Sequence, residues 1–332
     1  MLVIAEVGQA HEGSLGMALS YIGALAEAGV DAVKFQVHIA EAESSILEPF
    51  RIKFSEQDKT RFDYWKRMEF STDEWKLIKK TCEDNNVEFL ASPFSNAAVD
   101  LLEEVGVKRY KIGSGEVNNF LLLEKIAKTG KQVIISSGMS SFDELDATVS
   151  FLRERKISFS LLQCTTSYPT TPANYGLNVI QELKQRYKVK VGYSDHSSKI
   201  ETCIAATAMG AEILEFHAVF SRKSFGPDVS SSLELSEIRM LVAAIRNIST
   251  ALNEPVSKAD NSKYSGLKQI FEKSLAVNKD LRKGEIIKFE HLEAKKPKEY
   301  GIDASQFDQV IGKKIANDIN RFDFLTWSHL AE

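Results

Sequence analysis

The chain has 332 residues, 43% of them hydrophobic and 27% charged, with a formal net charge of −4 and a pI near 6.0. This composition is typical of a globular protein, and its acidic balance argues against nucleic acid or a membrane surface as a partner. Three widely spaced cysteines (Cys82, Cys164 and Cys203), a start without a signal-like segment and no apolar run of about 18 residues predict a cytoplasmic protein.

Strand-like and helix-like segments alternate along most of the chain. The predicted strands cover residues 2–7, 31–37, 87–91, 109–113, 132–136, 158–164, 189–193 and 211–217. The predicted helices cover residues 15–28, 75–85, 96–105, 118–128, 142–155, 178–186, 198–208 and 235–252, and Ser71 and Glu74 indicate a capped start for the second helix. Eight strand–helix pairs predict a (β/α)8 TIM barrel, although a doubly wound open sheet fits the same alternation.

Two regions depart from this alternation. Residues 38–69 form a polar and aromatic insertion that is too long for an ordinary loop, so we interpret it as a candidate lid. The second is the C-terminal part of the chain. We divide the whole chain into a barrel at 1–255, which includes the insertion, a polar linker at 256–272 and a small unit at 273–332. Short β segments are predicted in this unit at 274–277, 285–288, 310–315 and 322–326.

The sequence Tyr-Lys-Ile-Gly-Ser-Gly-Glu at 110–116 lies where the fourth strand turns into a helix. Its glycines allow backbone N–H groups to approach an anion, the following helix N-terminus favours negative charge, and Lys111 adds a positive charge. We interpret the stretch as a cradle for a phosphate or carboxylate. An ordinary surface loop with an unremarkable lysine is the alternative.

The predicted strands end in polar residues, and barrel chemistry gathers at the C-terminal ends of strands. His196 and His217 end neighbouring strands, so their imidazoles could hold one divalent metal ion, with Asp228 bonded to metal-bound water. The alternative is a core His217 bonded to a carbonyl group and a loop His196.

Lys34 and Lys111 permit two chemistries. Either lysine could form a Schiff base if it is desolvated and deprotonated. Two lysines near Ser92, Ser114 and Ser136 instead suit a dianionic phosphate, which we favour. A structural salt bridge between Lys34 and a glutamate of the barrel is a third possibility.

Motifs along nearly the whole chain resemble those of bacterial N-acetylneuraminate (sialic acid) synthases. They are His-Glu-Gly-Ser at 11–14, Val-Lys-Phe-Gln at 33–36, Ser-Pro-Phe at 92–94, the stretch at 110–116, Ser-Ser-Gly-Met at 136–139, Tyr-Pro-Thr at 168–170, Gly-Tyr-Ser-Asp-His at 192–196 and Gly-Pro-Asp at 226–228. The C-terminal unit resembles the antifreeze-like (SAF) domain of that family. Pseudaminate and legionaminate synthases share most of these motifs.

The resemblance implies condensation of phosphoenolpyruvate with the aldehyde of an N-acetylated sugar such as N-acetylmannosamine, giving N-acetylneuraminate and phosphate. It implies a divalent ion, Mn²⁺ first and Mg²⁺ or Co²⁺ as alternatives, held by His196 and His217. It also implies a domain-swapped homodimer. By position, the phosphoenolpyruvate ligands would be Lys111, Ser114, Ser136, Ser194 and Ser92. Glu12 would be the acid/base group, and the sugar, the metal water and the intermediate would be oriented by Lys34, Gln36, Glu116, Tyr168 and Asp228.

Three positions depart from the pattern of the family. Lys296 stands where an arginine usually reaches into the sugar site of the partner subunit, and a lysine lacks the bidentate fork of arginine. Thr166 replaces an asparagine near the phosphate, and Ser92 replaces a threonine. A Schiff-base aldolase and a non-catalytic carbohydrate-binding protein remain the other two function classes.

Overall fold

The computed structural model describes residues 1–54 and 57–331. It divides the chain into two compact units, Met1–Glu254 and Pro255–Glu332.

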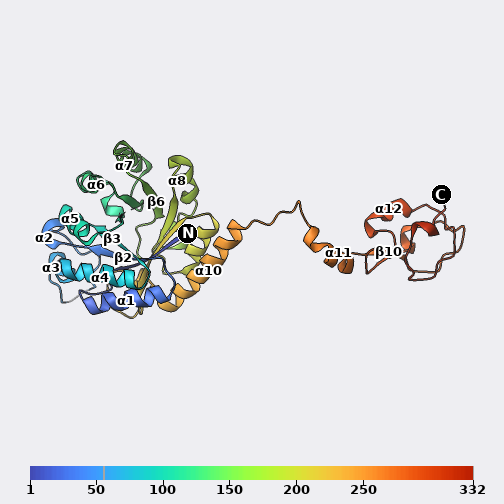
Figure 1. Cartoon of the computed structure of the whole chain (residues 1–332), viewed down its shortest axis with the longest axis horizontal. Coiled ribbons are helices and arrows are strands. Elements are labelled where there is room, and N and C mark those ends of the chain that lie inside the picture. The colour runs from blue at the N-terminus through green and yellow to red at the C-terminus, as the bar shows by residue number, and fades with distance from the viewer. Residues whose placement is uncertain (55–56, 332) are drawn as a thin grey trace. The chain divides into compact units, whose positions relative to one another are not determined.

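Across the described residues, eight parallel strands close into a barrel in the first unit (Figure 1). Hydrogen-bonded pairing runs in sequence order, and β1 also pairs with β8, so an open sheet is excluded. The predicted TIM barrel is therefore confirmed. Its strands are β1 (Leu2–Gly8), β2 (Ala32–Val37), β3 (Glu88–Pro93), β4 (Arg109–Ile112), β5 (Gln132–Ser136), β6 (Phe159–Cys164), β7 (Val191–Asp195) and β8 (Ile213–Val219), with a short β9 (Leu233–Glu234) beside β8.

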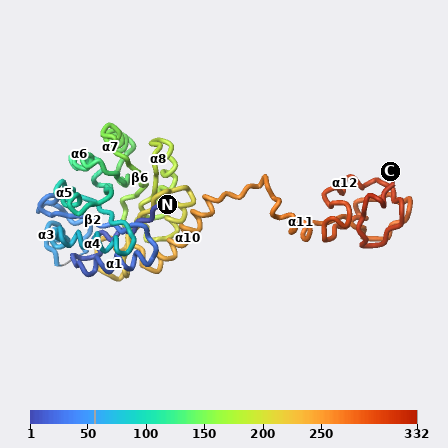
Figure 2. The backbone as a smooth tube through the Cα atoms, in the orientation of Figure 1, coloured from blue at the N-terminus to red at the C-terminus, as the bar shows by residue number. Residues whose placement is uncertain are grey.

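Helices surround these strands, as the tube in Figure 2 shows. The α-helices of the unit are α1 (Leu15–Glu27), α2 (Ala40–Glu43), α3 (Arg61–Met68), α4 (Thr72–Asp84), α5 (Asn96–Val105), α6 (Phe120–Ala127), α7 (Phe142–Glu154), α8 (Val179–Tyr187), α9 (Ile200–Ala208) and α10 (Leu235–Asn253). The predicted start of α4 is confirmed, since Ser71 and Glu74 form a reciprocal capping box. Among the described residues, we find no helix with the length and apolar character needed to cross a membrane.

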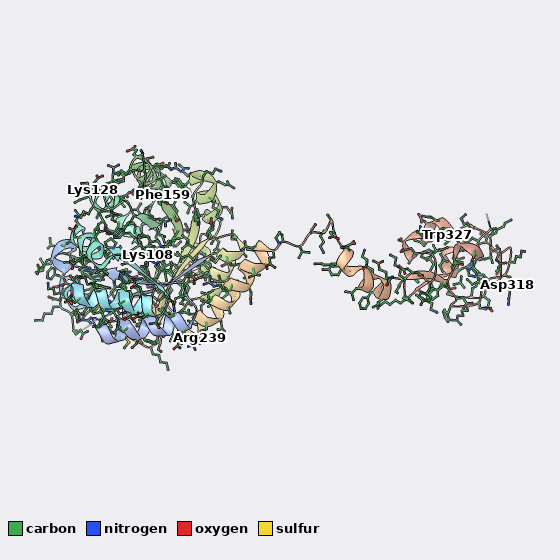
Figure 3. All side chains as sticks on the ribbon, viewed as in Figure 1. Lys108, Lys128, Phe159, Arg239, Asp318 and Trp327 are labelled. Carbon is green, nitrogen blue, oxygen red and sulfur yellow. The ribbon has the colours of Figure 1, made fainter. Side chains whose placement is uncertain are left out.

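The period-two alternation of strand side chains produces two separate apolar layers. Inside the barrel, the buried side chains of Ile4, Leu90, Ile134 and Leu162 form one cluster with their neighbours. A larger cluster lies between the outer faces of the strands and the helices, in the space that side chains occupy in Figure 3. The inner cluster closes the barrel interior and provides a floor for the polar residues further along the strands.

The insertion is ordered by an aromatic cluster of its own. Tyr64, Trp65 and Met68 on α3 pack with Ala40 on α2, and all four side chains are buried. The predicted lid therefore carries two short helices, although Ser55 and Glu56 lie outside the described residues.

The C-terminal unit contains less regular β structure than predicted. Of the four predicted segments, only the first forms a regular strand, β10 (Ser274–Val277). It pairs antiparallel with β11 (Leu292–Lys295), a strand that was not predicted from the sequence. The other three segments make isolated bridges, such as Ile286 with Lys314, and residue 310 ends the short helix α12 (Phe307–Val310). A small apolar core with many turns keeps these pairings short. The expected linker contains the helix α11 (Ser265–Phe271), so it is only partly extended.

We expect Gly192→Ala to destabilise the barrel. A Cβ atom on Gly192 would lie 2.2 Å from the carbonyl oxygen of Ile213 and 2.6 Å from Leu162 Cδ2, in the tight contact between β7 and β8. Such overpacking costs roughly 1–3 kcal/mol of unfolding free energy, measurable by urea denaturation with circular dichroism. Gly23→Ala is the matched control: nothing lies within 4 Å of its Cβ position in α1, and this helical replacement should stabilise by about 0.5–1 kcal/mol. Equal effects of the two changes would refute the packing argument.

Candidate active site

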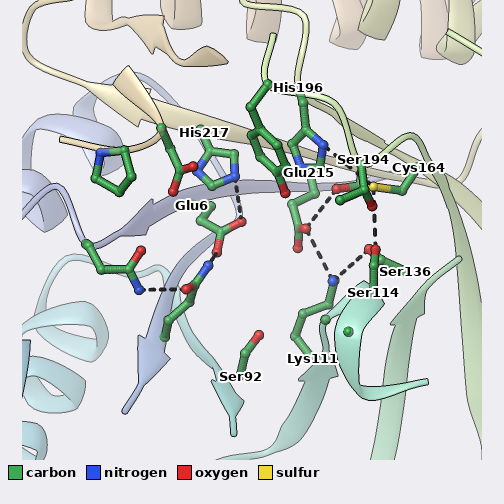
Figure 4. Close-up of a pocket in the computed structure, with 18 of the residues that line it drawn as sticks. Glu6, Ser92, Lys111, Ser114, Ser136, Cys164, Ser194, His196, Glu215 and His217 are labelled. Carbon is green, nitrogen blue, oxygen red and sulfur yellow. Dashed lines mark hydrogen bonds and ion pairs between the residues drawn. The ribbon is translucent and has the colours of Figure 1, made fainter. Parts of the chain in front are cut away.

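A cavity of about 350 Å³ opens at the C-terminal ends of the barrel strands. Each of the eight strands places a polar side chain along it, and Figure 4 shows most of them facing one another. In chain order they are Glu6, Lys34, Ser92, Lys111, Ser136, Cys164, Ser194 and, from β8, both Glu215 and His217. This layer lies above the apolar floor because it continues the inward-facing alternation of the same strands.

Four buried charges dominate the layer. Lys34 Nζ lies 2.9 Å from Glu6 Oε2 and 3.2 Å from Glu215 Oε1, and Lys111 Nζ lies 3.4 Å from Glu215 Oε1. Two lysines and two glutamates cancel in formal charge, which is what permits all four to be buried. The salt bridge that the sequence analysis considered for Lys34 is therefore present, with two partners.

The environments of the two lysines differ. Burial disfavours a charged Lys34, but the carboxylates of Glu215 and Glu6 outweigh it and raise the pKa of this lysine. Burial lowers the pKa of Lys111, opposed in part by Glu215, and the nearby charge of Lys34 lowers it further. Lys34 is thus held as an ammonium ion, whereas Lys111 is the more easily deprotonated of the two.

The cradle around Lys111 differs in part from the expected form. Lys111 Nζ donates to Ser136 Oγ at 2.8 Å, and Gly113, Ser114 and Gly115 line the cavity beside it. However, a 3-10 turn over Ser114–Glu116 follows β4, and the N-terminus of α6 is capped by the side chain of Asn119. The anion-binding groups at this point are therefore side chains and loop backbone, and the expected helix N-terminus is already satisfied.

The two histidines lie together in the same cavity. Their ring centroids are 5.4 Å apart, and both side chains are buried. His196 Nδ1 lies 2.9 Å from the carbonyl oxygen of Thr165, which can only accept, so Nδ1 carries a proton and Nε2 is the nitrogen that can bind a metal ion when the ring is neutral. His217 Nε2 lies 3.4 Å from Glu6 Oε2.

The two imidazoles can provide two ligands to one divalent metal ion. Within the described ranges 1–54 and 57–331, no cluster of three or more histidine, cysteine or acidic side chains has ligating geometry. Further ligands of a metal ion here would have to come from substrate or water.

The outer wall of the cavity carries aromatic rings and an arginine that is paired with a carboxylate. The ring of Tyr168 stacks on His196 with centroids 4.2 Å apart, and the guanidinium of Arg51 lies 4.1 Å above the ring of Tyr168. Arg51 also donates to Asp228 Oδ1 at 2.6 Å. Thr166 also lines the cavity, and its Oγ1 and that of Ser114 both lie close to Gly138. The loops after β6 and β8 and the insertion therefore meet around this part of the cavity.

Most of the residues predicted for the site line this one cavity. They are Lys34, Gln36, Ser92, Lys111, Ser114, Ser136, Thr166, Tyr168, Ser194, His196, His217 and Asp228.

Two predicted site residues of the barrel, Glu12 and Glu116, do not line this cavity, and the third remaining one, Lys296, belongs to the other unit. Glu12 faces a neighbouring pocket and accepts a hydrogen bond from Arg67 at 2.9 Å, and Glu116 accepts one from Asn119 at 2.7 Å. Lys296 belongs to the C-terminal unit, where its ammonium lies 4.9 Å from the ring centroid of Phe271.

The sequence analysis missed Glu6, Gln9, Cys164 and the arginines of the insertion. Glu6 lies within the strand predicted at residues 2–7, and its even spacing from Leu2 and Ile4 places it on the inner face of β1. Gln36 donates to Glu6 Oε1 at 2.5 Å and accepts from Gln9 at 2.6 Å, so Glu6 is fixed by a chain of amides. The arginines gave no such signal, because their position depends on how the insertion folds.

Comparisons with known proteins give a consistent result. The model of the NeuB family matches residues 21–257, and that of the SAF domain matches residues 272–331. The chain is 36% identical over 318 residues to the N,N'-diacetyllegionaminic acid synthase of Campylobacter jejuni, covering 94% of this chain and 95% of that protein. It is 32% identical over 331 residues to the human N-acetylneuraminate-9-phosphate synthase, covering 97% and 90%.

A solved structure shares this fold. It is that of the N-acetylneuraminic acid (sialic acid) synthetase of Leptospira borgpetersenii in complex with citrate. Its TM-score to this chain is 0.70 at 33% identity, and the match covers 80% of this chain and 89% of that one.

We expect Lys34→Met to destabilise the barrel strongly, because it leaves Glu6 and Glu215 without their shared cation. Removing one partner of a buried ion cluster costs about 3–5 kcal/mol of unfolding free energy. Lys76→Met is the control, since Lys76 pairs with Glu104 at 2.7 Å on the exposed surface, where loss of an ion pair has little effect on stability. Urea denaturation of both variants provides the comparison, and a Lys34 variant as stable as the control would contradict the role of the cluster.

Proposed function

The chain belongs to the NeuB family, and from this premise we propose that it is a nonulosonic acid synthase that condenses phosphoenolpyruvate with the open-chain aldehyde of an N-acetylated sugar. The acceptor that we place first is N-acetylmannosamine, which would give N-acetylneuraminate and phosphate. Acceptors that give legionaminate or pseudaminate are the alternatives. The observation that carries the proposal is the single cavity that joins the Lys111 cradle to the pair His196 and His217.

The proposed reaction forms one carbon–carbon bond and releases phosphate. C3 of phosphoenolpyruvate attacks the aldehyde carbon, whose oxygen takes a proton. Water then adds to the cationic C2, losing one proton. In the resulting tetrahedral intermediate the bond from C2 to the phosphate oxygen breaks, and the C2 hydroxyl gives its proton to the leaving phosphate and becomes the ketone. The cradle of Lys111, Ser114 and Ser136 would hold the phosphate from the first step to its release, because an ammonium and two hydroxyl groups provide charge-assisted donors.

We assign the contact with the attacking water to Glu6 in place of Glu12. Glu6 lines the cavity, and its Oε1 already accepts from Gln36. Burial would raise the pKa of Glu6, but the charges of Lys34, His217 and Lys111 hold it well below its ordinary value, so the carboxylate is ionised. Its Oε2, which pairs with Lys34 at 2.9 Å and lies beside His217, would accept a hydrogen bond from the water that attacks C2 and so orient it.

His196 and His217 would hold the proposed divalent ion, Mn²⁺ first and Mg²⁺ or Co²⁺ as alternatives. When bound, such an ion polarises the oxygen of the aldehyde and so favours attack on its carbon. The protein orients the first of these ligands through the bond from His196 Nδ1 to the carbonyl oxygen of Thr165.

The role that we propose for the C-terminal unit rests on its resemblance to the family. We propose a domain-swapped homodimer in which Lys296 of one subunit approaches the acceptor end of the cavity of the other. Lys296 is exposed on its own unit, which leaves its side chain accessible for such a contact.

A direct test incubates the full chain and Mn²⁺ with phosphoenolpyruvate and one acceptor at a time. The acceptors are N-acetylmannosamine, 2,4-diacetamido-trideoxy hexoses and arabinose 5-phosphate, and the readouts are phosphate release and product mass. Phosphate release with an N-acetylated acceptor is expected. No release with any acceptor would refute the synthase and favour a binding protein.

The lowered pKa of Lys111 is the observation that favours the second candidate, a Schiff-base aldolase. Borohydride in the presence of each carbonyl substrate separates the two candidates. A stable adduct on Lys111 or Lys34 would support the aldolase, whereas the synthase should retain its activity and its mass.

We expect Lys111→Met to raise the KM for phosphoenolpyruvate by at least about tenfold, with far less effect on the KM for the sugar, because the lost contact is to the anion. Lys125→Met is the control, since Lys125 pairs with Asp100 at the surface. Initial rates of phosphate release with each substrate varied in turn give both constants. An unchanged KM for phosphoenolpyruvate would make Lys111 a structural residue.

We expect His217→Ala to lose both the metal ion and the activity while the barrel stays folded. Atomic emission should find about one Mn²⁺ per wild-type chain after dialysis and almost none in the variant, because one of two imidazole ligands is gone. Circular dichroism checks the fold. Equal metal content in the two proteins would place the metal site elsewhere.

A further inference from the structure

Arg61 has unused hydrogen-bonding capacity in the wall of the cavity. It is the first residue of α3, and its side chain lines the cavity while only 14% of it is exposed. In the described part of the chain, its Nε and Nη1 atoms are buried without a hydrogen-bond partner. Buried guanidinium donors without acceptors are costly, so this arrangement calls for an acceptor group that the protein itself does not supply.

The orientation of Arg61 is fixed by a stack of planar groups. Its guanidinium lies 4.3 Å over the ring of Trp65, which stacks on His38 with ring centroids 3.7 Å apart. His38 in turn stacks on Phe94 at 4.5 Å. His38 is held in place by Gln9 at 2.8 Å and by Glu43 at 2.5 Å. The guanidinium is therefore presented to the cavity by a rigid support.

The charge of Arg61 is already compensated by a carboxylate, whereas its Nε and Nη1 donors have no hydrogen-bond acceptor. Glu48 Oε1 lies 3.5 Å from Arg61 Nε, and Glu48 Oε2 accepts from Trp65 Nε1 at 3.0 Å. Arg51, the second arginine that lines this wall, is paired with Asp228. Two arginines and two carboxylates thus leave the wall formally neutral. What the site lacks is a hydrogen-bond acceptor, and a further anion would face two carboxylates.

We infer that Arg61 is a specificity-determining residue that donates to the carbonyl oxygen of an acetamido group on the acceptor sugar. An acetamido group is neutral, planar and apolar at its methyl end, so it matches unpaired guanidinium donors beside the flat side chains of Trp65 and Phe94. This inference rests on the proposed function, because it names the group by which that site recognises its sugar. We do not assign phosphoenolpyruvate to this role, because the cradle around Lys111 is the site proposed for its phosphate.

The test compares the wild type with Arg61→Lys and Arg61→Ala in titration calorimetry. The ligands are N-acetylmannosamine, mannose, N-acetylmannosamine 6-phosphate and phosphoenolpyruvate. The wild type should bind N-acetylmannosamine at least about tenfold more tightly than mannose, in line with a charge-assisted hydrogen bond. Both variants should bring that ratio close to one and leave the Kd for phosphoenolpyruvate unchanged. Arg61→Lys keeps the charge opposite Glu48, so it isolates the loss of the planar donors.

Lys66→Ala is the matched control on the same helix. Lys66 is half exposed and pairs with Glu41 and Glu69, away from the cavity, so its loss should change none of the four dissociation constants.

Three outcomes would overturn the inference. In the first, both variants still bind N-acetylmannosamine more tightly than mannose. In the second, both variants bind phosphoenolpyruvate more weakly than the wild type. In the third, the wild type binds N-acetylmannosamine 6-phosphate more tightly than N-acetylmannosamine. Failure of the proposed function is distinguishable. Arg61-dependent binding of N-acetylmannosamine without phosphate release would refute the synthase and leave this inference intact. Phosphate release only with acceptors that lack an acetamido group would support a phosphoenolpyruvate-dependent synthase and refute the role of Arg61.

Discussion

The buried ion cluster of Glu6, Lys34, Lys111 and Glu215 is the interaction on which the site depends. Four charges inside a barrel are tolerable because they neutralise one another at separations of 2.9 to 3.4 Å. The same compensation keeps Glu6 ionised and Lys34 protonated. A cavity lined by fixed charges is prepared for an anionic substrate before that substrate arrives, and it needs little reorganisation when charge develops.

The barrel places these charges by the alternation of its strands. On β8, Ile213 belongs to the apolar floor, whereas Glu215 and His217 line the cavity above it, in steps of two residues along one strand. The same change from apolar to polar occurs on β1 between Ile4 and Glu6. The apolar floor and the polar site are thus separated by only two residues along each of these strands.

Much of this arrangement could be predicted from the sequence. Regular strand–helix alternation gave the barrel, and polar strand ends gave most of the cavity, since the ends of parallel strands converge whatever their loops do. Glu12 shows the limit: a positive φ of 52° turns its loop so that the carboxylate meets Arg67 and another pocket. The positions of Arg51 and Arg61 depend on the aromatic packing of the insertion, which no periodicity encodes. In the C-terminal unit, pairings of one or two residues are too short to leave an alternating pattern.

The stack of Arg61, Trp65, His38 and Phe94 has a consequence for how such an enzyme can diversify. Three of its four members belong to the insertion, whereas the ion cluster and the phosphate cradle are built on the strands and the loop after β4. A substitution in the insertion can therefore reshape this wall of the cavity. A change at His38 would also reach the ion cluster, because Gln9 bonds both His38 and Gln36, and Gln36 donates to Glu6. In the proposed synthase, changes at Arg61 or Trp65 would alter the wall that faces the sugar while leaving the strands that carry the ion cluster unchanged.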